Sequence, residues 1–215
     1  MKSKYKLICF DMDGTLIDSM GYWRMCNVEF LLRHHLPFDP ELMRDALFQS
    51  SRVMVPRYIE HYGLKEDPEE LYREYEVMML AHYEQGIRTK PGALKYLIAL
   101  RRQGIRACVG TATPRLIAER ALARAGLSSC VEFVTDPHEL GATKDDPEFY
   151  RRLARRAGVD VGEIAMFEDA LYAMRGAKAA GCGVFGIEEP ASFRDEAAIR
   201  EICDVYVHSF EEMLQ

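Results

Sequence analysis

The chain has 215 residues and a formal net charge of −6 at pH 7, with 48% hydrophobic and 29% charged residues. This length fits one large domain, or one domain with a smaller insert, and the composition excludes disordered, collagen-like and coiled-coil chains. No apolar run approaches the ~18 residues of a membrane span or the core of a signal peptide. The acidic balance argues against nucleic acid as a partner.

Residues 5–10 form an apolar run that ends at Asp11, which predicts a buried strand. Residues 17–89 contain no comparable strand run, and the spacing of their apolar residues predicts four helices. This region holds 13 acidic and 8 basic residues, so it carries −5 of the total charge of −6. We therefore expect residues 17–89 to form an inserted helical domain.

From Pro91 onward, predicted helices and strands alternate with short loops between them. Helices are expected over 93–103, 114–125, 147–157 and 171–180, and strands over 105–110, 131–135, 164–167, 183–187 and 205–207, with a helix at the end. Such alternation predicts an α/β fold: a Rossmann-like, doubly wound parallel sheet. Its core comprises residues 1–16 and 90–215.

The six cysteines are spread along the chain without a CxxC pair. This spacing gives no support for a zinc site, and the thiols are expected to be reduced in a cytoplasmic protein.

The predicted strands end in residues that carry chemistry. The first is followed by Asp11-Met12-Asp13-Gly14-Thr15-Leu16, the second by Thr111 and Ala112, and Lys144 and Glu168-Asp169 follow the next two strands. In open α/β sheets, ligands bind beyond the carboxyl ends of the strands. Several carboxylates around one lysine favour a divalent cation, with Mg²⁺ the usual one where phosphate is handled. Hydroxyls, backbone N–H groups and a lysine suit a phosphoryl group.

Each of these features also has a purely structural interpretation. Asp13-Gly14 is a common turn pair, and Lys144 could be a solvated loop residue. Thr111 and Glu168-Asp169 could each cap the helix that follows. The functional interpretation rests on all four features occurring together at strand ends.

The sequence DMDGTL at 11–16, with Thr111, Lys144 and Glu168-Asp169 in order, resembles the four motifs of the haloacid dehalogenase superfamily, in its phosphatase and phosphomutase branch. The resemblance covers essentially the whole core, and residues 17–89 match the family's small helical cap. It implies that Asp11 is the nucleophile and a metal ligand. Asp13 would be the general acid/base, and its backbone carbonyl would bind Mg²⁺.

The resemblance implies further that Asp169 binds Mg²⁺ directly and Glu168 acts through water. Thr111 and the backbone near Ala112 would bind the transferring phosphoryl group. Lys144 would neutralise charge on the nucleophile and on the phosphoryl oxygens. Within the family, an acid at position 13 favours phosphate monoesters over halide or phosphonate substrates.

The segment 135–144 resembles the β-phosphoglucomutase subgroup, but Trp23 stands where those mutases carry a histidine. Tryptophan cannot serve as an acid or base at neutral pH. We therefore expect an Mg²⁺-dependent phosphatase acting on a small phosphorylated metabolite, such as a sugar or polyol phosphate. A phosphomutase and a non-catalytic phospho-receiver are the alternatives. No membrane partner is expected, and a monomer is plausible.

Two residues of the predicted cap are candidates for substrate binding. Arg52 lies in the segment 48–52, where the family places its specificity loop, and could clamp a hydroxyl or carboxylate. It could equally be an exposed arginine at the start of a helix. Trp23 could line the pocket or pack within the cap.

Overall fold

A six-stranded parallel sheet forms the centre of the protein. The computed structural model describes residues 4–46, 49 and 51–214. The strands are β1 (Leu7–Phe10), β2 (Arg106–Gly110), β3 (Val134–Thr135), β4 (Ile164–Glu168), β5 (Gly183–Ile187) and β6 (Val205–Val207). They are ordered β3-β2-β1-β4-β5-β6, and every neighbouring pair is parallel. The predicted fold class is confirmed.

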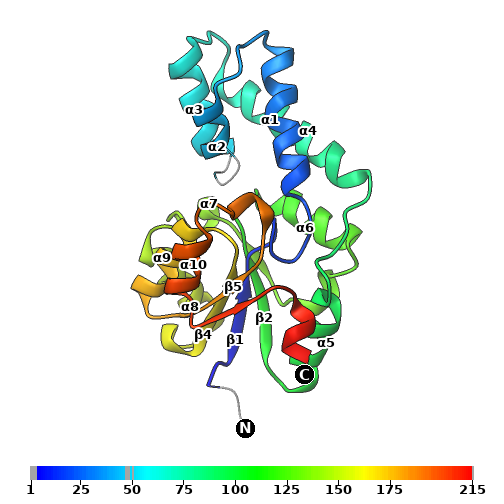
Figure 1. The fold of residues 1–215 in the computed structure, drawn as a ribbon, viewed down its shortest axis with the longest axis vertical. Coiled ribbons are helices and arrows are strands. Elements are labelled where there is room, and N and C mark those ends of the chain that lie inside the picture. The colour runs from blue at the N-terminus through cyan, green and yellow to red at the C-terminus, as the bar shows by residue number, and fades with distance from the viewer. Residues whose placement is uncertain (1–3, 47–48, 50, 215) are drawn as a thin grey trace.

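Helices cover both faces of this sheet (Figure 1). After residue 90, the helices in chain order are α5 (Ala93–Arg102), α6 (Arg115–Arg124), α7 (Pro137–Leu140), α8 (Pro147–Ala157), α9 (Leu171–Ala180) and α10 (Glu196–Ile202). Short 3₁₀ turns lie at η1 (Ser128–Cys130), η2 (Val161–Glu163), η3 (Pro190–Ser192) and η4 (Phe210–Leu214).

The strand β1 has no polar residue because both of its faces are buried. Ile8 and Phe10 pack into the cluster under α5 and α6, whereas Leu7 and Cys9 pack into the cluster under α8 and α9. Buried parallel strands are uniformly apolar for this reason. β1 therefore lies centrally, and its carboxyl end sits among those of β2 and β4.

Several predicted boundaries differ from the structure. The predicted strand 131–135 shortens to Val134–Thr135, because this edge strand pairs with β2 alone. The helix expected at the C-terminus is the 3₁₀ turn η4. The helices α7 and α10 were not predicted, since each is too short to show a clear apolar period.

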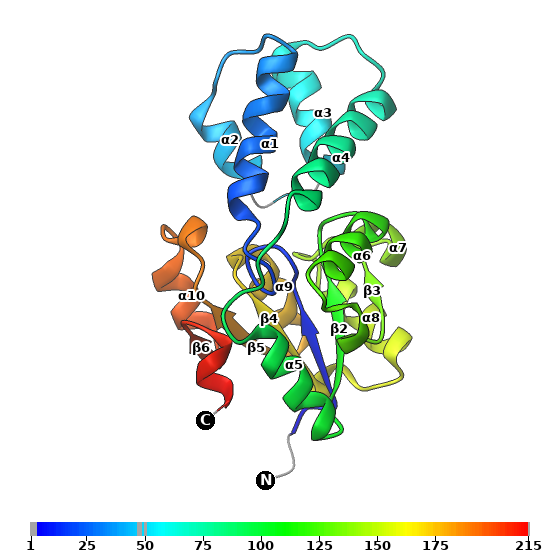
Figure 2. The same cartoon turned by 90° about the vertical axis from the view of Figure 1, so that its right-hand side faces the viewer.

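The helices between β1 and α5 stand together beyond the carboxyl edge of the sheet (Figures 1 and 2). They are α1 (Met20–Arg33), α2 (Pro40–Ala46), α3 (Ser51–Tyr62) and α4 (Pro68–Glu84). In their interior, Phe30 stacks on Tyr58 and lies at a tilt against Tyr75. Asp67 caps α4 by accepting a hydrogen bond from the backbone N–H of Glu69 at 2.7 Å. This packing gives the α1–α4 segment apolar contacts of its own.

Two chain segments connect the α1–α4 segment to the sheet, and they run side by side. The Asp18 N–H donates to the Arg88 carbonyl and the Lys90 N–H donates to the Leu16 carbonyl, each at 2.9 Å. Both connections are also visible next to each other in Figure 2. A pair of short, hydrogen-bonded connections suits a hinge.

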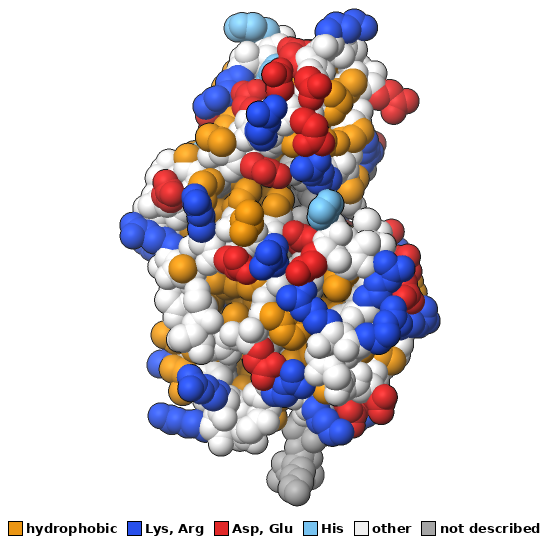
Figure 3. All heavy atoms as spheres, turned by 180° about the vertical axis from the view of Figure 1, so that it is seen from behind, with side chains coloured by type: hydrophobic (Ala, Val, Ile, Leu, Met, Phe, Trp, Pro, Cys, Tyr) orange, Lys and Arg blue, Asp and Glu red, His pale blue; other side chains and the backbone are white. Residues whose placement is uncertain are grey.

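Acidic and basic side chains are intermixed over the rear face of the molecule (Figure 3). Within the residues described, no helix combines the length and the apolar character needed to cross a bilayer.

A buried ion pair fastens the second connection to the sheet. The Lys90 ammonium donates to Glu189 Oε2 at 2.5 Å and to the Glu188 carbonyl at 3.3 Å. The side chains of Lys90 and Glu189 are only 10% and 5% exposed. A charge at this depth needs its partner, because water cannot replace it.

We expect Lys90→Met to lower the free energy of unfolding by about 3–5 kcal/mol, because it leaves the Glu189 carboxylate buried without its cation. Urea unfolding would measure the loss. The double variant Lys90→Met/Glu189→Gln should recover much of it. A single variant as stable as the wild type would show that the pair does not hold this connection.

Candidate active site

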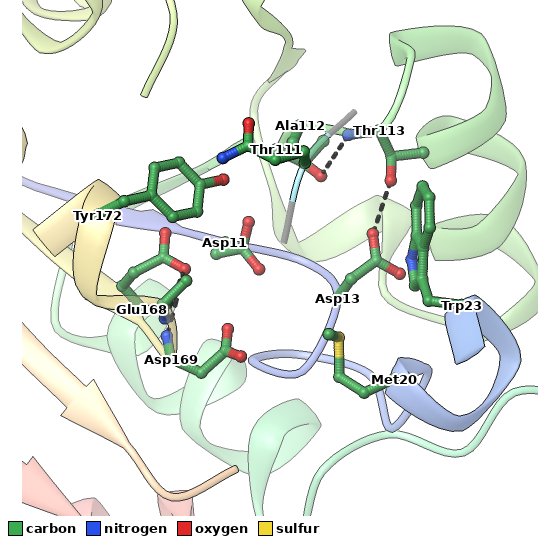
Figure 4. Close-up of a pocket in the computed structure, with 12 residues that line it drawn as sticks. Asp11, Asp13, Met20, Trp23, Thr111, Ala112, Thr113, Glu168, Asp169 and Tyr172 are labelled. Carbon is green, nitrogen blue, oxygen red and sulfur yellow. Dashed lines mark hydrogen bonds between the residues drawn. The ribbon is translucent and has the colours of Figure 1, made fainter. Parts of the chain in front are cut away.

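Most of the predicted site residues meet at the carboxyl edge of β1, β2 and β4 (Figure 4). All of them except Lys144 and Arg52 surround a small cavity of about 40 Å³. Its walls are formed by Asp11, Asp13, Met20, Trp23, Gln49, Thr111, Ala112, Thr113, Glu168, Asp169, Ala170 and Tyr172. Since a water molecule needs ~10–15 Å³ of such space, the cavity has room for roughly a phosphoryl group.

Lys144 links two of the carboxylates. Its ammonium donates to Asp11 Oδ1 and to Glu168 Oε2, both at 2.6 Å, and the lysine is 2% exposed. Its loop passes very close to α9, where a Cβ at Gly176 would overlap the Lys144 carbonyl oxygen. A glycine in α9 therefore allows the lysine loop to approach the site.

Burial and the neighbouring charges in this cluster shift the pKa values of its members. Burial raises the pKa of Asp11 well above its usual range, and the nearby Glu168 carboxylate adds to the shift, while Lys144 opposes it. Burial alone would lower the pKa of Lys144, but Asp11 and Glu168 hold it well above its usual range. The lysine is therefore a permanent cation. Burial likewise raises the pKa of Asp169, with Glu168 and Asp11 contributing.

The side chains of Asp11, Glu168 and Asp169 form an acidic cluster whose ligand atoms lie within 4.8 Å of one another. Asp169 Oδ1 accepts a hydrogen bond from the Thr15 hydroxyl at 3.0 Å. Its other oxygen, Oδ2, is buried and has no hydrogen-bond partner within the described residues. An unpaired buried carboxylate oxygen next to two further carboxylates is the donor set that a hard divalent cation requires. The cluster thus fits a metal ion.

Gly14 lets the β1 loop turn tightly against this cluster. Its φ of 82° lies in the left-handed region, and a Cβ there would come within 2.6 Å of Asp169 Oδ2. Only glycine fits both conditions. The Asp-Gly pair of the sequence is therefore a turn and also part of the site.

The Asp13 carboxylate points away from the acidic cluster, toward Thr113 and Trp23 (Figure 4). It accepts hydrogen bonds from the hydroxyls of Ser19 (2.6 Å), Tyr83 (2.6 Å) and Thr113 (2.7 Å). Tyr83 belongs to α4, so this carboxylate also joins the sheet to the α1–α4 segment. These hydroxyls fix the orientation of the side chain beside the cavity.

Thr111 and Ala112 line the cavity opposite Glu168 and Asp169 (Figure 4). The Thr111 hydroxyl oxygen accepts a hydrogen bond from the Thr113 N–H at 3.1 Å. Its own proton remains available to an acceptor in the cavity.

The two candidates from the α1–α4 segment have different surroundings. Trp23 is 5% exposed, lies against the ring of Tyr75 and also lines the cavity. It therefore packs within the α1–α4 segment and forms part of the cavity wall. Arg52 instead pairs with Glu69 at 2.7 Å and lies over the ring of Tyr72. It is not among the described residues that surround the cavity.

In the segment proposed as a specificity loop, Phe48 and Ser50 lie outside the described residues. Gln49 does line the cavity.

The sequence did not indicate three of the residues found here. Tyr83 and Tyr172 reach the site from helices distant in the chain, and a tyrosine in an amphipathic helix looks like a core residue. Thr113 follows Thr111 and Ala112 after the predicted strand 105–110 and had no assigned role. Its distance of two residues from Thr111 was the one available signal.

Comparisons with known proteins identify the family of this chain. The sequence profile of the family described as haloacid dehalogenase-like hydrolase matches residues 5–181. A phosphoglycolate phosphatase of Rhodospirillum rubrum is 30% identical, over 83% of this chain and 78% of its own. Hexitol phosphatase A of Escherichia coli is 27% identical, over 95% and 91%.

A crystal structure of CbbY from Rhodobacter sphaeroides in complex with phosphate superposes with a TM-score of 0.82. It is 25% identical and covers 97% of this chain and 96% of its own. The six-stranded parallel sheet with helices on both faces defines the class as an α/β protein with a Rossmann-like fold. The chain belongs to the haloacid dehalogenase-like hydrolase family, as the sequence motifs predicted.

Replacing Tyr83 by Phe should lower the free energy of unfolding by about 1–3 kcal/mol, because it removes a buried hydrogen bond to a carboxylate. Urea denaturation would measure the change. The matched control is Tyr22→Phe, which removes a longer bond (3.2 Å) from Tyr22 to the Gly86 carbonyl near the surface. Equal losses for the two variants would contradict a special role for the contact between Tyr83 and Asp13.

Proposed function

We propose that this hydrolase is an Mg²⁺-dependent phosphatase. Its substrate would be a phosphate monoester of a small metabolite of the sugar or polyol type, and the reaction would pass through an aspartyl-phosphate. The observation that carries the proposal is the Asp11 carboxylate, which is held by Lys144 and lines a cavity of phosphoryl size. The family match and the phosphatases among the relatives confirm the predicted enzyme class, a phosphoric monoester hydrolase.

In the first step, an Asp11 carboxylate oxygen attacks the phosphorus atom and the bond from phosphorus to the ester oxygen breaks. Thr111 and the backbone N–H groups near Ala112 would hold the phosphoryl oxygens. The Lys144 ammonium would offset the negative charge shared by Asp11 and the transferring group. Catalysis of this kind depends mainly on position and electrostatics.

Proton transfer is assigned to Asp13. In its protonated form it gives a proton to the departing alkoxide, so the product leaves as an alcohol. The resulting carboxylate then takes a proton from the water that attacks the aspartyl-phosphate, which releases inorganic phosphate and restores Asp11. The hydroxyls of Ser19, Tyr83 and Thr113 would position this carboxyl between its two tasks.

The metal would be held by Asp11 and Asp169, with Glu168 acting through water and the Asp13 backbone carbonyl as a further ligand. A bound divalent cation supplies positive charge next to the phosphoryl oxygens. Support comes from the unpaired Asp169 Oδ2 and from the surplus of carboxylates over lysine.

The α1–α4 segment would act as a cap, with residues 17–89 moving about the paired connections to the sheet. Closure would exclude bulk water before attack and bring the segment's residues against the leaving group. Trp23 lies at the cavity wall and offers no acid or base, which supports hydrolysis over phosphate transfer within a sugar.

The cytoplasm is the proposed compartment. All six cysteines lie within the described residues and none forms a disulfide, as suits a reducing environment.

The test is phosphate release from a panel of sugar, polyol and carboxylic acid phosphates, with Mg²⁺ and with a chelator. We expect turnover of at least one ester, and Asp11→Asn should reduce kcat by more than about a thousandfold, because an amide is not a nucleophile here. Asp160→Asn, at the opposite end of the sheet, is the control and should retain activity. Folded protein that turns over no ester would refute the proposal. NMR of glucose 1-phosphate incubations would reveal any isomerised product.

Metal binding can be measured without activity. Saturating Mg²⁺ should raise the Tm of the wild type by about 5 °C, since a ligand at 100 times its Kd contributes about 2.7 kcal/mol. Asp169→Asn should lose most of this shift. In a chelator, the same variant should be at least as stable as the wild type, because it buries one charge fewer. A full Mg²⁺ shift in the variant would contradict the assignment of Asp169.

A further inference from the structure

A second and larger cavity adjoins the active site. Its volume is about 360 Å³, and it shares the wall residues Gln49, Ala170 and Tyr172 with the first cavity. Its remaining walls are formed by Arg57, Leu171, Arg175, Ala191, Ser192, Arg194 and Asp195. It therefore lies where α3 of the α1–α4 segment faces α9 and the η3 turn of the core (Figure 1).

The walls of this second cavity are basic, although the chain as a whole is acidic. Arg57 comes from α3, Arg175 from α9 and Arg194 from the segment after η3. Among the described lining residues, Asp195 is the one acidic side chain beside these three arginines. The described wall residues are therefore more basic than the chain as a whole, which carries a net charge of −6. Guanidinium groups remain charged at any physiological pH and match carboxylates and phosphates with two parallel hydrogen bonds.

Two other features of the same wall favour an anion. The helix α9 begins at Leu171, and its N-cap residue Ala170 provides no side-chain hydrogen bond to the first turn. The positive end of its dipole therefore lies at the cavity. The hydroxyl of Ser192, 6% exposed, has no hydrogen-bond partner in the described part of the chain. It is a further group that can donate to a ligand.

The volumes of the two cavities indicate that each would hold a different part of the substrate. The first, of about 40 Å³, has room for the transferring phosphoryl group. The rest of the ester has to extend past Gln49 and Tyr172 into the second, which has the volume of a small-molecule site.

We propose that the second cavity is a substrate subsite for an anionic group at the far end of the phosphate ester, either a carboxylate or a second phosphate. Arg57, Arg175 and Arg194 would bind this group. The proposal rests on the proposed phosphatase function and narrows its substrate class to esters with a second negative charge. Because Arg57 lies in the α1–α4 segment and the other two arginines in the core, such a group would also favour closure.

The first experiment compares matched esters. In the wild type, kcat/KM for 3-phosphoglycerate should exceed that for glycerol 3-phosphate by about tenfold or more, as one well-placed charge contact allows. Fructose 1,6-bisphosphate against fructose 6-phosphate gives the same comparison for a second phosphate. The pair with the larger ratio of kcat/KM, charged to neutral ester, shows whether the second cavity prefers a carboxylate or a phosphate. The advantage should shrink in high salt, because ions screen exposed arginines.

The second experiment removes the arginines singly. Arg175→Gln and Arg194→Gln should each lower the ratio of charged to neutral ester about tenfold. Arg102→Gln, an exposed arginine on α5 away from both cavities, is the matched control and should leave the ratio unchanged. Binding can be measured separately by calorimetry of the two esters with the Asp11→Asn protein and Mg²⁺, where the same preference should appear.

The possible outcomes separate the two proposals. If no ester is hydrolysed but the Asp11→Asn protein prefers the charged ester, the phosphatase proposal fails and the subsite stands. If esters are hydrolysed with equal kcat/KM for charged and neutral members of both pairs, the subsite is refuted and the phosphatase stands. An advantage that survives both arginine variants would also overturn the assignment of this cavity.

Discussion

The rest of the site depends on how charge is balanced around one buried lysine. Lys144 contacts Asp11 and Glu168, and Asp169 stands next to them with one oxygen unpaired. Three carboxylates and one ammonium cannot all be stable in a place closed to water without more positive charge. The Gly14 turn, the Gly176 contact and the strand ends all serve to bring these groups within hydrogen-bond reach. The same imbalance that is costly for folding prepares the edge of the sheet for a cation and a phosphoryl group.

The second constraint is the connection between the sheet and the α1–α4 segment. The two connecting segments are hydrogen-bonded to each other. The Lys90–Glu189 ion pair holds the second of them to the loop after β5. Asp13 adds a contact across the same boundary, because its carboxylate accepts a hydrogen bond from the Tyr83 hydroxyl of α4. The candidate acid/base is thus sensitive to the position of the helices above it. In the proposed mechanism, these contacts would couple closure of the α1–α4 segment to the placement of Asp13 as proton donor.

The charge of the α1–α4 segment affects how an anionic substrate would reach the boundary between this segment and the sheet. The α1–α4 segment is acidic overall, so an anionic substrate is not drawn in by the general field of the molecule. Local groups have to bind it instead. The arginines of the second cavity provide such local attraction, and they do so from both sides of the boundary.

The sequence by itself determined the alternation of strands and helices, because both faces of a parallel sheet are buried and its strands are apolar throughout. It also determined the chemical groups at the strand ends, since Asp11 and Thr111 directly follow β1 and β2 and Glu168 ends β4, whereas Lys144 comes from the loop after α7. The bounds of the edge strand β3 were predicted wrongly, and the short helix α7 was missed. Both have too few residues to show a periodic pattern of apolar side chains.

Only the tertiary structure decided which distant residues join these groups. Tyr83 reaches Asp13 across 70 positions, and Arg57 faces Arg175 and Arg194 across a cavity between different elements. Arg52, with the same side chain and five residues from Arg57, pairs with Glu69 instead. Sequence spacing specifies the face of a helix, but the neighbour of that face depends on how the helices pack.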